Sequence, residues 1–97
     1  MELAQIRYFL ALCETRSFTR AARQCGVSQP SLSNAIKALE GELGSALVQR
    51  SPFSLTPAGK AILPHFRGAL RHIRQARKAG TMQSHRTDAV SSPAVQL

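Results

Sequence analysis

Polar side chains able to read nucleic acid recur at helical spacing between residues 29 and 37. They lie on one face of a predicted helix, which Pro30 shares, or at its N-terminal end: Gln29, Ser31, Ser33, Asn34 and Lys37. Glutamine and asparagine amides can pair bidentately with adenine, serine hydroxyls can reach base edges or phosphates, and a lysine ammonium attracts phosphate. This pattern is typical of a helix that enters the major groove of duplex DNA.

The helix that positions these side chains needs an apolar back, and the sequence provides one. Its residues are spaced by four, three and four positions, which places them on one side of a helix: Leu32, Ile36, Leu39 and Leu43. Ser28 is the predicted N-cap, and Pro30 is tolerated in a first turn, where backbone N–H groups have no helical partner. We therefore expect an amphipathic recognition helix that begins just after Ser28.

A shorter helix precedes it and completes a predicted helix-turn-helix over about residues 18–37. Ser17 is its expected N-cap, and Gly26 stands where it must end, because glycine adopts the left-handed conformation at little cost. Small residues on its apolar face let the second helix cross closely: Ala21, Ala22 and Cys25. Thr19, in the first turn, is a candidate to donate its hydroxyl to a phosphate, since helix N-termini favour anions, although the same residue also suits a plain helix start.

A further apolar helix is expected before this pair, from Leu3 to Thr15. Its stripe should pack on the helix-turn-helix: Leu3, Ile6, Phe9, Leu10 and Cys13. Tyr8 and Leu12 lie off that stripe. They either contact a partner subunit or are partly buried within one monomer.

After Gly44 the sequence predicts two short strands, residues 46–50 and 53–55, joined by the turn signal Ser51-Pro52. A hairpin in this place would be the wing of a winged helix-turn-helix. Arg50 is its predicted phosphate or minor-groove contact, and a solvated cation is the alternative.

A long helix is predicted from its N-cap at Thr56 to about Ala79. Basic residues occupy one side, and the other carries an apolar stripe with heptad-like spacing: Ile62, Phe66, Ala69, Leu70 and Ile73. We interpret the stripe as a short dimerisation seam, because a three-helix unit has little spare surface to cover it. The alternative is a helix folded back on its own domain. Pro64 and Gly68 weaken the helix, and residues 80–97, which lack periodicity, are predicted to be a disordered tail.

The composition favours a polyanionic partner. The chain has 97 residues, enough for one small domain, and its 13 Lys and Arg against 5 Asp and Glu give a net charge of +8. Arg86 and Asp88 cancel, so the excess lies in the first 80 residues. No apolar run approaches the roughly 20 residues of a membrane span, and the N-terminus lacks the pattern of a secretory signal.

The sequence gives no support to catalytic or metal chemistry. The acidic residues of the predicted domain are scattered over helix surfaces, and there is no glycine-rich phosphate loop or nucleophile motif. Cys13 and Cys25 are interpreted as buried free thiols in a reducing cytoplasm, in preference to a disulfide or a zinc site. His65 and His72 have no further ligands nearby in the sequence. We expect no enzyme, no cofactor and no metal.

Five blocks of residues follow one another at characteristic spacing: Ile6–Phe9, Ser17–Ala22, Val27–Ser33, Leu39-Glu40 with Leu43-Gly44, and Leu55–Gly59. In these blocks and their order, residues 4–59 resemble the DNA-binding domain of LysR-type transcriptional regulators. This resemblance implies a mainly α fold, in which residues 1–58 form a winged helix-turn-helix of three helices and a two-stranded wing. Residues 59–79 would be the linker helix, which in the family pairs with its copy.

The chain also departs from the family pattern. The wing is a couple of residues shorter than usual, and Pro52, Phe53 and Ser54 stand where basic residues are common. Asn34 stands where many relatives carry arginine. The family's effector-binding domain would begin after residue 80, and the sequence contains none.

We therefore predict sequence-specific binding of duplex DNA, at a roughly palindromic operator, by a homodimeric transcriptional regulator of the bacterial cytoplasm that is associated with the nucleoid. The predicted DNA contacts are Thr19, Ser28, Gln29, Pro30, Ser31, Ser33, Asn34, Lys37 and Arg50. The alternative is a truncated regulator that acts by dimerising with full-length relatives.

Overall fold

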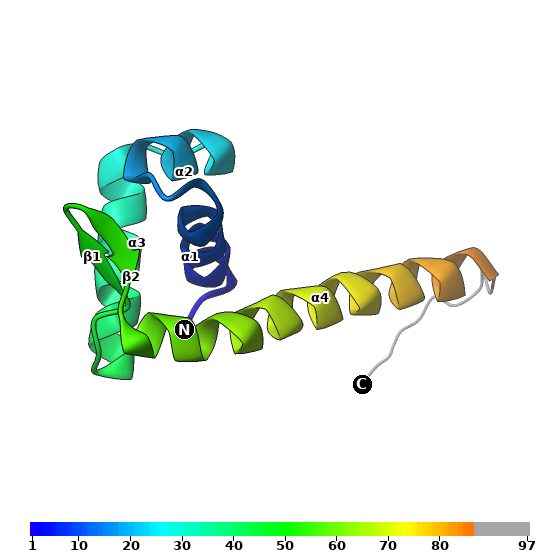
Figure 1. The fold of residues 1–97 in the computed structure, drawn as a ribbon. Coiled ribbons are helices and arrows are strands. Elements are labelled where there is room, and N and C mark those ends of the chain that lie inside the picture. Colours follow the sequence, from blue (N-terminus) through cyan, green and yellow to red (C-terminus); the bar gives the residue numbers. More distant parts are fainter. Residues whose placement is uncertain (87–97) are drawn as a thin grey trace.

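A computed structural model of the chain describes residues 1–86, which form four helices and one two-stranded antiparallel sheet. The elements follow in the order α1 (Leu3–Thr15), α2 (Phe18–Cys25), α3 (Gln29–Leu43), β1 (Val48–Arg50), β2 (Phe53–Leu55) and α4 (Pro57–Arg86). In Figure 1 the first three helices and the hairpin form one body, from which the second half of α4 projects. The predicted winged helix-turn-helix with a long final helix is confirmed.

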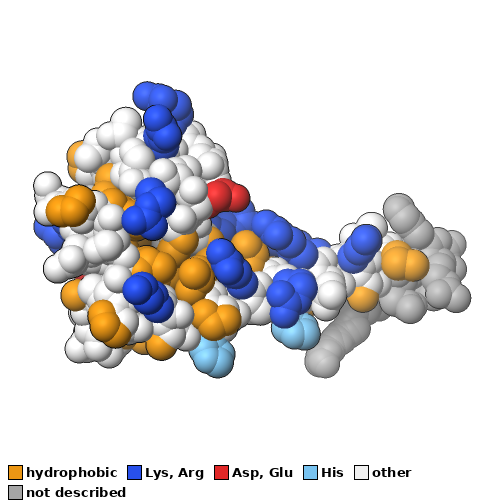
Figure 2. Space-filling model, viewed as in Figure 1, with side chains coloured by type: hydrophobic (Ala, Val, Ile, Leu, Met, Phe, Trp, Pro, Cys, Tyr) orange, Lys and Arg blue, Asp and Glu red, His pale blue; other side chains and the backbone are white. Residues whose placement is uncertain are grey.

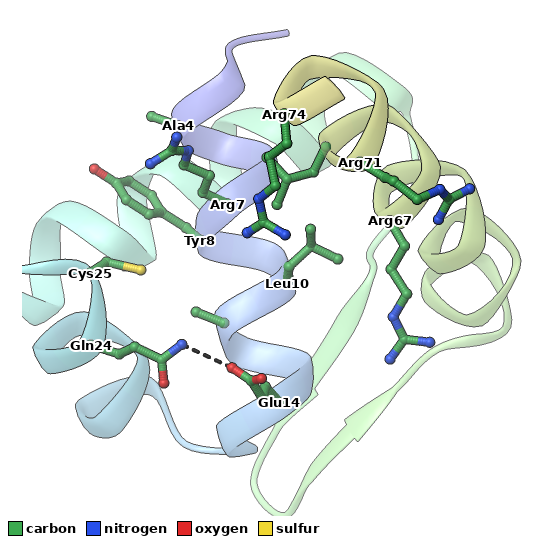
Figure 3. A pocket seen from close by; sticks show the side chains of 12 residues that line it. Ala4, Arg7, Tyr8, Leu10, Glu14, Gln24, Cys25, Arg67, Arg71 and Arg74 are labelled. Carbon is green, nitrogen blue, oxygen red and sulfur yellow. Dashed lines mark hydrogen bonds between the residues drawn. The ribbon is translucent and has the colours of Figure 1, made fainter. Parts of the chain in front are cut away.

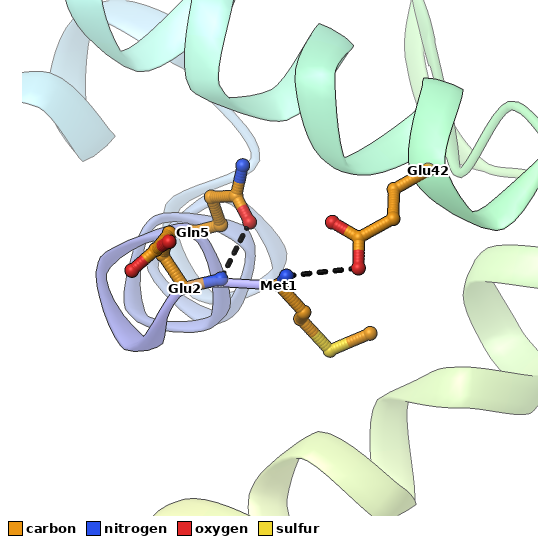
Figure 4. Close-up of polar contacts among 4 residues, drawn as sticks. All are labelled: Met1, Glu2, Gln5 and Glu42. Carbon is orange, nitrogen blue, oxygen red and sulfur yellow. Dashed lines mark hydrogen bonds and ion pairs between the residues drawn. The ribbon is translucent and has the colours of Figure 1, made fainter.

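Polar contacts fix the N-terminal end of α1. The backbone N–H of Glu2 donates to Gln5 Oε1 at 2.8 Å, which satisfies one amide at the helix start. The Met1 amine forms an ion pair with the Glu42 carboxylate at 2.8 Å, and this hydrogen bond raises the pKa of the amine. Figure 4 shows how the pair joins the start of α1 to the end of α3.

The helix-turn-helix has the capping residues that the sequence predicts. The Ser17 hydroxyl accepts from the Arg20 N–H at 3.1 Å, and the Ser28 hydroxyl accepts from the Ser31 N–H at 3.1 Å. Gly26 ends α2 with φ at 72°, in the left-handed region that favours glycine. Both helices therefore begin and end where local chemistry places them.

The three helices and β1 enclose the core. Its largest fully buried side chains come from α1, α3 and the start of the wing: Phe9, Leu12, Leu32, Ile36, Leu39 and Leu47. Each such side chain contributes about 1.5–3 kcal/mol by leaving water. Leu12 thus lies inside the monomer and does not contact a partner subunit through an exposed surface. Tyr8 is half-buried against the same core.

The wing is shorter than predicted, since β1 begins at Val48 and not at residue 46. The Glu40 carboxylate holds the start of the wing against α3, because its Oε2 accepts from the N–H groups of Leu47, at 2.7 Å, and Val48, at 3.3 Å. In the hairpin Val48 pairs with Leu55 and Arg50 with Phe53.

A close contact joins the wing to α4. The Thr56 hydroxyl accepts from the Gly59 N–H at 3.0 Å and donates to the Ala46 carbonyl at 2.6 Å, so Thr56 caps α4 as predicted. A Cβ atom on Gly59 would overlap the Leu47 carbonyl oxygen. Only glycine lets the first turn of α4 approach the wing this closely.

The prediction for the end of α4 is wrong, because the helix continues to Arg86 in place of ending near Ala79. One glycine in a helix costs about 1 kcal/mol, and Gly80 is followed by residues without a helix breaker, so the helix passes through it. Pro64 also lies inside the helix. Of the predicted disordered tail, residues 80–86 are helical, and residues 87–97 lie outside the described part of the chain.

The expectation that a monomer leaves the α4 stripe uncovered is also wrong. Phe66 and Leu70 are buried, and the Phe66 ring packs edge-on against Phe9 of α1, with 5.7 Å between ring centroids. Ile62, Ala69 and Ile73 are half-buried. The first half of α4 folds back on α1, and α1 thus supplies the surface that covers Phe66.

Candidate nucleic-acid interface

The N-terminal face of α3 is exposed while its back is in the core. Leu32, Ile36 and Leu39 are fully buried, so the opposite side of the helix must face outward. Among the predicted DNA contacts on α3 and its N-cap, Ser33 is half-buried. The others are exposed: Ser28, Gln29, Pro30, Ser31, Asn34 and Lys37. The structure thus places the predicted α3 contacts on one accessible surface.

Thr19 of α2 is joined to this surface. Its hydroxyl donates to Gln29 Oε1 at 3.2 Å, so the first turns of α2 and α3 lie side by side. The hydrogen bond holds the Gln29 side chain while its amide N–H groups remain available as donors. It also occupies the Thr19 proton that the sequence analysis assigned to a phosphate.

Ser28 and Ser31 form a small network at the start of α3. The Ser28 hydroxyl accepts from the Ser31 N–H and donates to the Ser31 hydroxyl at 2.9 Å. Capping is therefore the observed role of Ser28. Ser31 keeps its own hydroxyl proton for a ligand.

The exposed Arg50 side chain of the wing makes defined contacts with α2 and α3. Its Nη1 donates to Ser33 Oγ at 3.1 Å, and the guanidinium carbon lies 4.3 Å from the centroid of the Phe18 ring. This arrangement combines a hydrogen bond with a cation–π contact. It brings three elements together, because Phe18 begins α2, Ser33 lies on α3 and Arg50 ends β1.

A second arginine holds the other side of the wing. Arg16, which has a left-handed backbone with φ at 57°, donates from Nη2 to the Phe53 carbonyl at 3.1 Å and lies 5.2 Å from the Phe53 ring centroid. The Phe53 and Phe18 rings pack edge-on with centroids 6.4 Å apart. We call the four side chains the Arg–Phe clasp: Arg16, Phe53, Phe18 and Arg50.

The clasp was not predicted from the sequence. Phe18 was named only within the block Ser17–Ala22, Phe53 only as a departure from the family pattern in the wing, and Arg16 not at all. The turn after α1 and the register of the hairpin decide these contacts, and the only local signal was the pair of aromatic residues next to Ser17 and Pro52.

The electrostatics of the described chain are those of an anion-binding surface. Figure 2 shows Lys and Arg side chains over the domain and along α4. Among the side chains that the structure describes, those of residues 1–82, the one ion pair is that of the Met1 amine with Glu42, and Arg50 has no acidic partner there. Its positive charge is therefore uncompensated at the edge of the α3 surface.

A second basic surface is a cleft of about 800 Å³ between α1, α2 and α4. Figure 3 shows four arginines around it: Arg7, Arg67, Arg71 and Arg74. Its one carboxylate, that of Glu14, accepts from Gln24 Nε2 at 2.9 Å. None of its lining residues belongs to α3 or the wing, so the cleft is separate from the predicted contacts.

The cysteines are half-buried free thiols, less enclosed than predicted. Burial raises the pKa of Cys13 to about 11, and it also raises the pKa of Cys25. Thiols of this kind are weak nucleophiles at neutral pH. Among residues 1–82, whose side chains the structure describes, no three His, Cys, Asp or Glu side chains converge in a way that could hold a metal ion.

Comparison with known protein families identifies the family of this chain. Residues 3–60, more than half of the chain, match the family described as bacterial regulatory helix-turn-helix protein, lysR family. The chain belongs to the lysR family. The resemblance noted from the sequence is thereby confirmed.

Relatives and solved structures agree with this assignment. The chain is 45% identical over 80 residues to the SDS degradation transcriptional activation protein of a Pseudomonas strain, which covers 80% of this chain and 26% of the relative. It is 38% identical over 85 residues to the DNA-binding transcriptional dual regulator OxyR of Escherichia coli, covering 86% and 28%. The chain thus spans about a quarter of the length of these curated relatives.

Among solved structures, the complex of BenM_DBD with benA site 1 DNA superposes with a TM-score of 0.82 at 36% identity, covering 87% of this chain and 97% of that one. The CbnR_DBD–DNA complex gives a TM-score of 0.81 at 34% identity, covering 87% of this chain and 99% of that one.

Within residues 1–86, every helix of this lysR-family chain is too short or too polar to cross a membrane.

Proposed function

We propose that this lysR-family domain binds duplex DNA in a sequence-specific manner and so regulates transcription. The observation that carries the proposal is the accessible polar face of α3, backed by a fully buried apolar face. The two DNA complexes that share this fold at more than 30% identity support it. The relatives are named as transcriptional regulators, which supports a non-enzymatic role.

The roles of individual side chains follow from their chemistry. Gln29, Pro30, Ser33 and Asn34 would face base edges, and amides at the exposed start of a recognition helix are suited to adenine. The remaining predicted contacts would position the domain on phosphates: Thr19, Ser28, Ser31, Lys37 and Arg50. Thr19 would do so after exchanging its hydrogen bond with Gln29 for one with DNA.

We propose further that the domain acts as a homodimer through the second half of α4. In Figure 1 this half leaves the domain, and the residues from Arg74 to Met82 are all exposed. An isolated helix gains most of its stability from packing, so a second copy would stabilise this segment. Phe66 and Leu70 lie inside the domain, and the seam would therefore use Ala69, Ile73 and, three residues further on, Ala76.

A two-fold dimer predicts a roughly palindromic operator, with half-sites about one or two turns of the duplex apart. The Ile73→Asn variant should dissociate the dimer, and Gln75→Asn, at an exposed position two residues further on, is the matched control. Sedimentation that gives a monomer for the unmodified chain at high concentration would contradict the dimer.

Capture of full-length relatives would use the same α4 surface, and no separate observation favours it. A bacterial cytoplasmic site at the nucleoid would follow from the proposed DNA binding.

The DNA-binding proposal is tested by selecting duplexes from a random pool with the whole chain and then titrating a selected and a random duplex. Asn34→Ala should lower affinity for the selected duplex by about 1–3 kcal/mol and change random-duplex binding much less. Gln75→Ala, an exposed amide on α4, is the control and should change neither. Failure to enrich any sequence, or equal losses on both duplexes, would count against base reading by α3.

A further inference from the structure

The Arg–Phe clasp holds the Arg50 side chain in one position at the surface of the domain. Arg50 lies where the wing meets α3, with one of its donors on Ser33 and one face of the guanidinium over Phe18. A guanidinium has five N–H donors in a plane, so most of them stay free at the edge that the ring does not cover. Arg50 is nevertheless exposed.

We propose that Phe18 and Phe53 are positioning residues, which hold the Arg50 guanidinium beside Ser33 so that it receives one DNA phosphate without first having to be ordered. This inference rests on the proposed DNA binding. Arg50 is the residue that would touch DNA, while the two rings would act through it. The wing tip lacks basic residues, which leaves Arg50 as the cation that the hairpin can offer.

Ordering in advance matters because an arginine side chain is flexible. Freezing all of its rotamer freedom on binding would weaken association by up to about 25-fold. The contact with Phe18 and the hydrogen bond to Ser33 confine Arg50 before DNA arrives, so part of that loss is avoided.

Phe53 completes the arrangement from the other side. Its ring packs edge-on against Phe18, and Arg16 fixes its carbonyl and covers its ring. Contacts therefore run without a break from the end of α1, through the two rings, to Arg50 and α3. A wing held at both strands has less freedom to carry Arg50 away from the recognition helix.

A phosphate is the favoured ligand over a base. Arg50 belongs to β1 of the wing and reaches α3 only through Ser33, one turn after the exposed first turn that carries Gln29 and Pro30. A planar fork of N–H donors with uncompensated charge matches phosphate oxygens well.

The experiment is a double-mutant cycle on the whole chain, with affinity for a selected and a random duplex measured at several salt concentrations. Phe18→Leu keeps an apolar side chain but removes the ring, and it should weaken binding to both duplexes about three-fold without changing the salt slope. Phe18→Tyr keeps the ring and should restore the affinity. In an Arg50→Ala background, Phe18→Leu should have no further effect, because its influence passes through Arg50.

Arg50→Ala should weaken binding to all sequences and lower the salt slope by about one, whereas Arg77→Ala on the projecting part of α4 is the matched control and should leave the slope unchanged. Arg50→Lys keeps the positive charge and leaves Phe18 in place, so the salt slope should be retained. The affinity should fall several-fold, because lysine lacks the planar fork of N–H donors.

Additive effects of Phe18→Leu and Arg50→Ala would overturn the positioning role, and a loss confined to the selected duplex would overturn the phosphate assignment. If the unmodified chain bound neither duplex, the proposed function itself would fail. The two failures are thus distinguishable.

Discussion

Replacement of Phe66 by alanine tests whether the first half of α4 belongs to the domain core. Phe66 is only 5% exposed and packs edge-on against Phe9 with centroids 5.7 Å apart. Truncating a buried phenylalanine costs about 3–5 kcal/mol, of which the aromatic pair accounts for roughly 0.5–1.5 kcal/mol. Because Phe66 lies where two helices meet and not at the centre of the core, we expect about 3 kcal/mol.

A loss of that size is a large part of the stability of a small domain, which is about 5–15 kcal/mol. At about 4–8 °C per kcal/mol, Phe66→Ala should lower Tm by roughly 12–24 °C in thermal unfolding followed by circular dichroism. Gln75→Ala, at an exposed position on the same helix, is the control and should leave Tm nearly unchanged.

The dependence on protein concentration separates the core from a subunit interface. A loss inside one chain persists at every concentration, whereas a loss at an interface disappears when the unmodified protein is already monomeric. If Phe66→Ala and the unmodified chain had the same Tm at high dilution, the assignment of Phe66 to the core would be refuted.

Three further changes test the packing of the domain. Gly59→Ala should destabilise it by about 1–3 kcal/mol in denaturant titration, because the new Cβ meets a backbone carbonyl, while Gly41→Ala, in open space on α3, should stabilise by up to about 1 kcal/mol. Equal effects of the two would show that the α4–wing contact is looser than described. Glu40→Gln should cost about 1–2 kcal/mol by weakening the acceptor of two amides at the start of the wing, and an unchanged midpoint would remove that role. Burial raises the pKa of Cys13 to about 11, so roughly one part in a thousand of this thiol should be thiolate at pH 8. In a Cys25→Ser background, the rate of Cys13 alkylation should therefore rise about tenfold for each pH unit above pH 8 until the pKa is approached. Fast, pH-independent labelling would contradict this.

The parts of the fold that sequence predicted are those decided by neighbouring residues. Ser17 and Ser28 cap their helices because a hydroxyl reaches N–H groups only three residues ahead, and Gly26 ends α2 because the left-handed turn is needed there. The apolar stripe of α3 fixed which side faces outward. For that reason the exposure of the polar residues in its first turns could be predicted without a structure.

The parts that sequence did not predict depend on contacts between distant residues. The burial of Phe66 requires α1 to cross α4, and helical spacing on one element cannot distinguish that partner from a second copy. Likewise, Phe18 meets Arg50 because the hairpin folds over the start of α2. Spacing placed both on the right elements, but only the tertiary arrangement brings them within 4.3 Å.

The central claim is that DNA lies against the exposed face of α3 and not in the arginine-lined cleft between α1 and α4. Amide chemical shifts of the labelled chain, followed while a selected duplex is added, test it most directly. The largest changes should fall on residues 28–37 and on Arg50, with small changes at Arg7, Arg67 and Arg71. Changes concentrated at those three arginines, with residues 28–37 unaffected, would contradict the account.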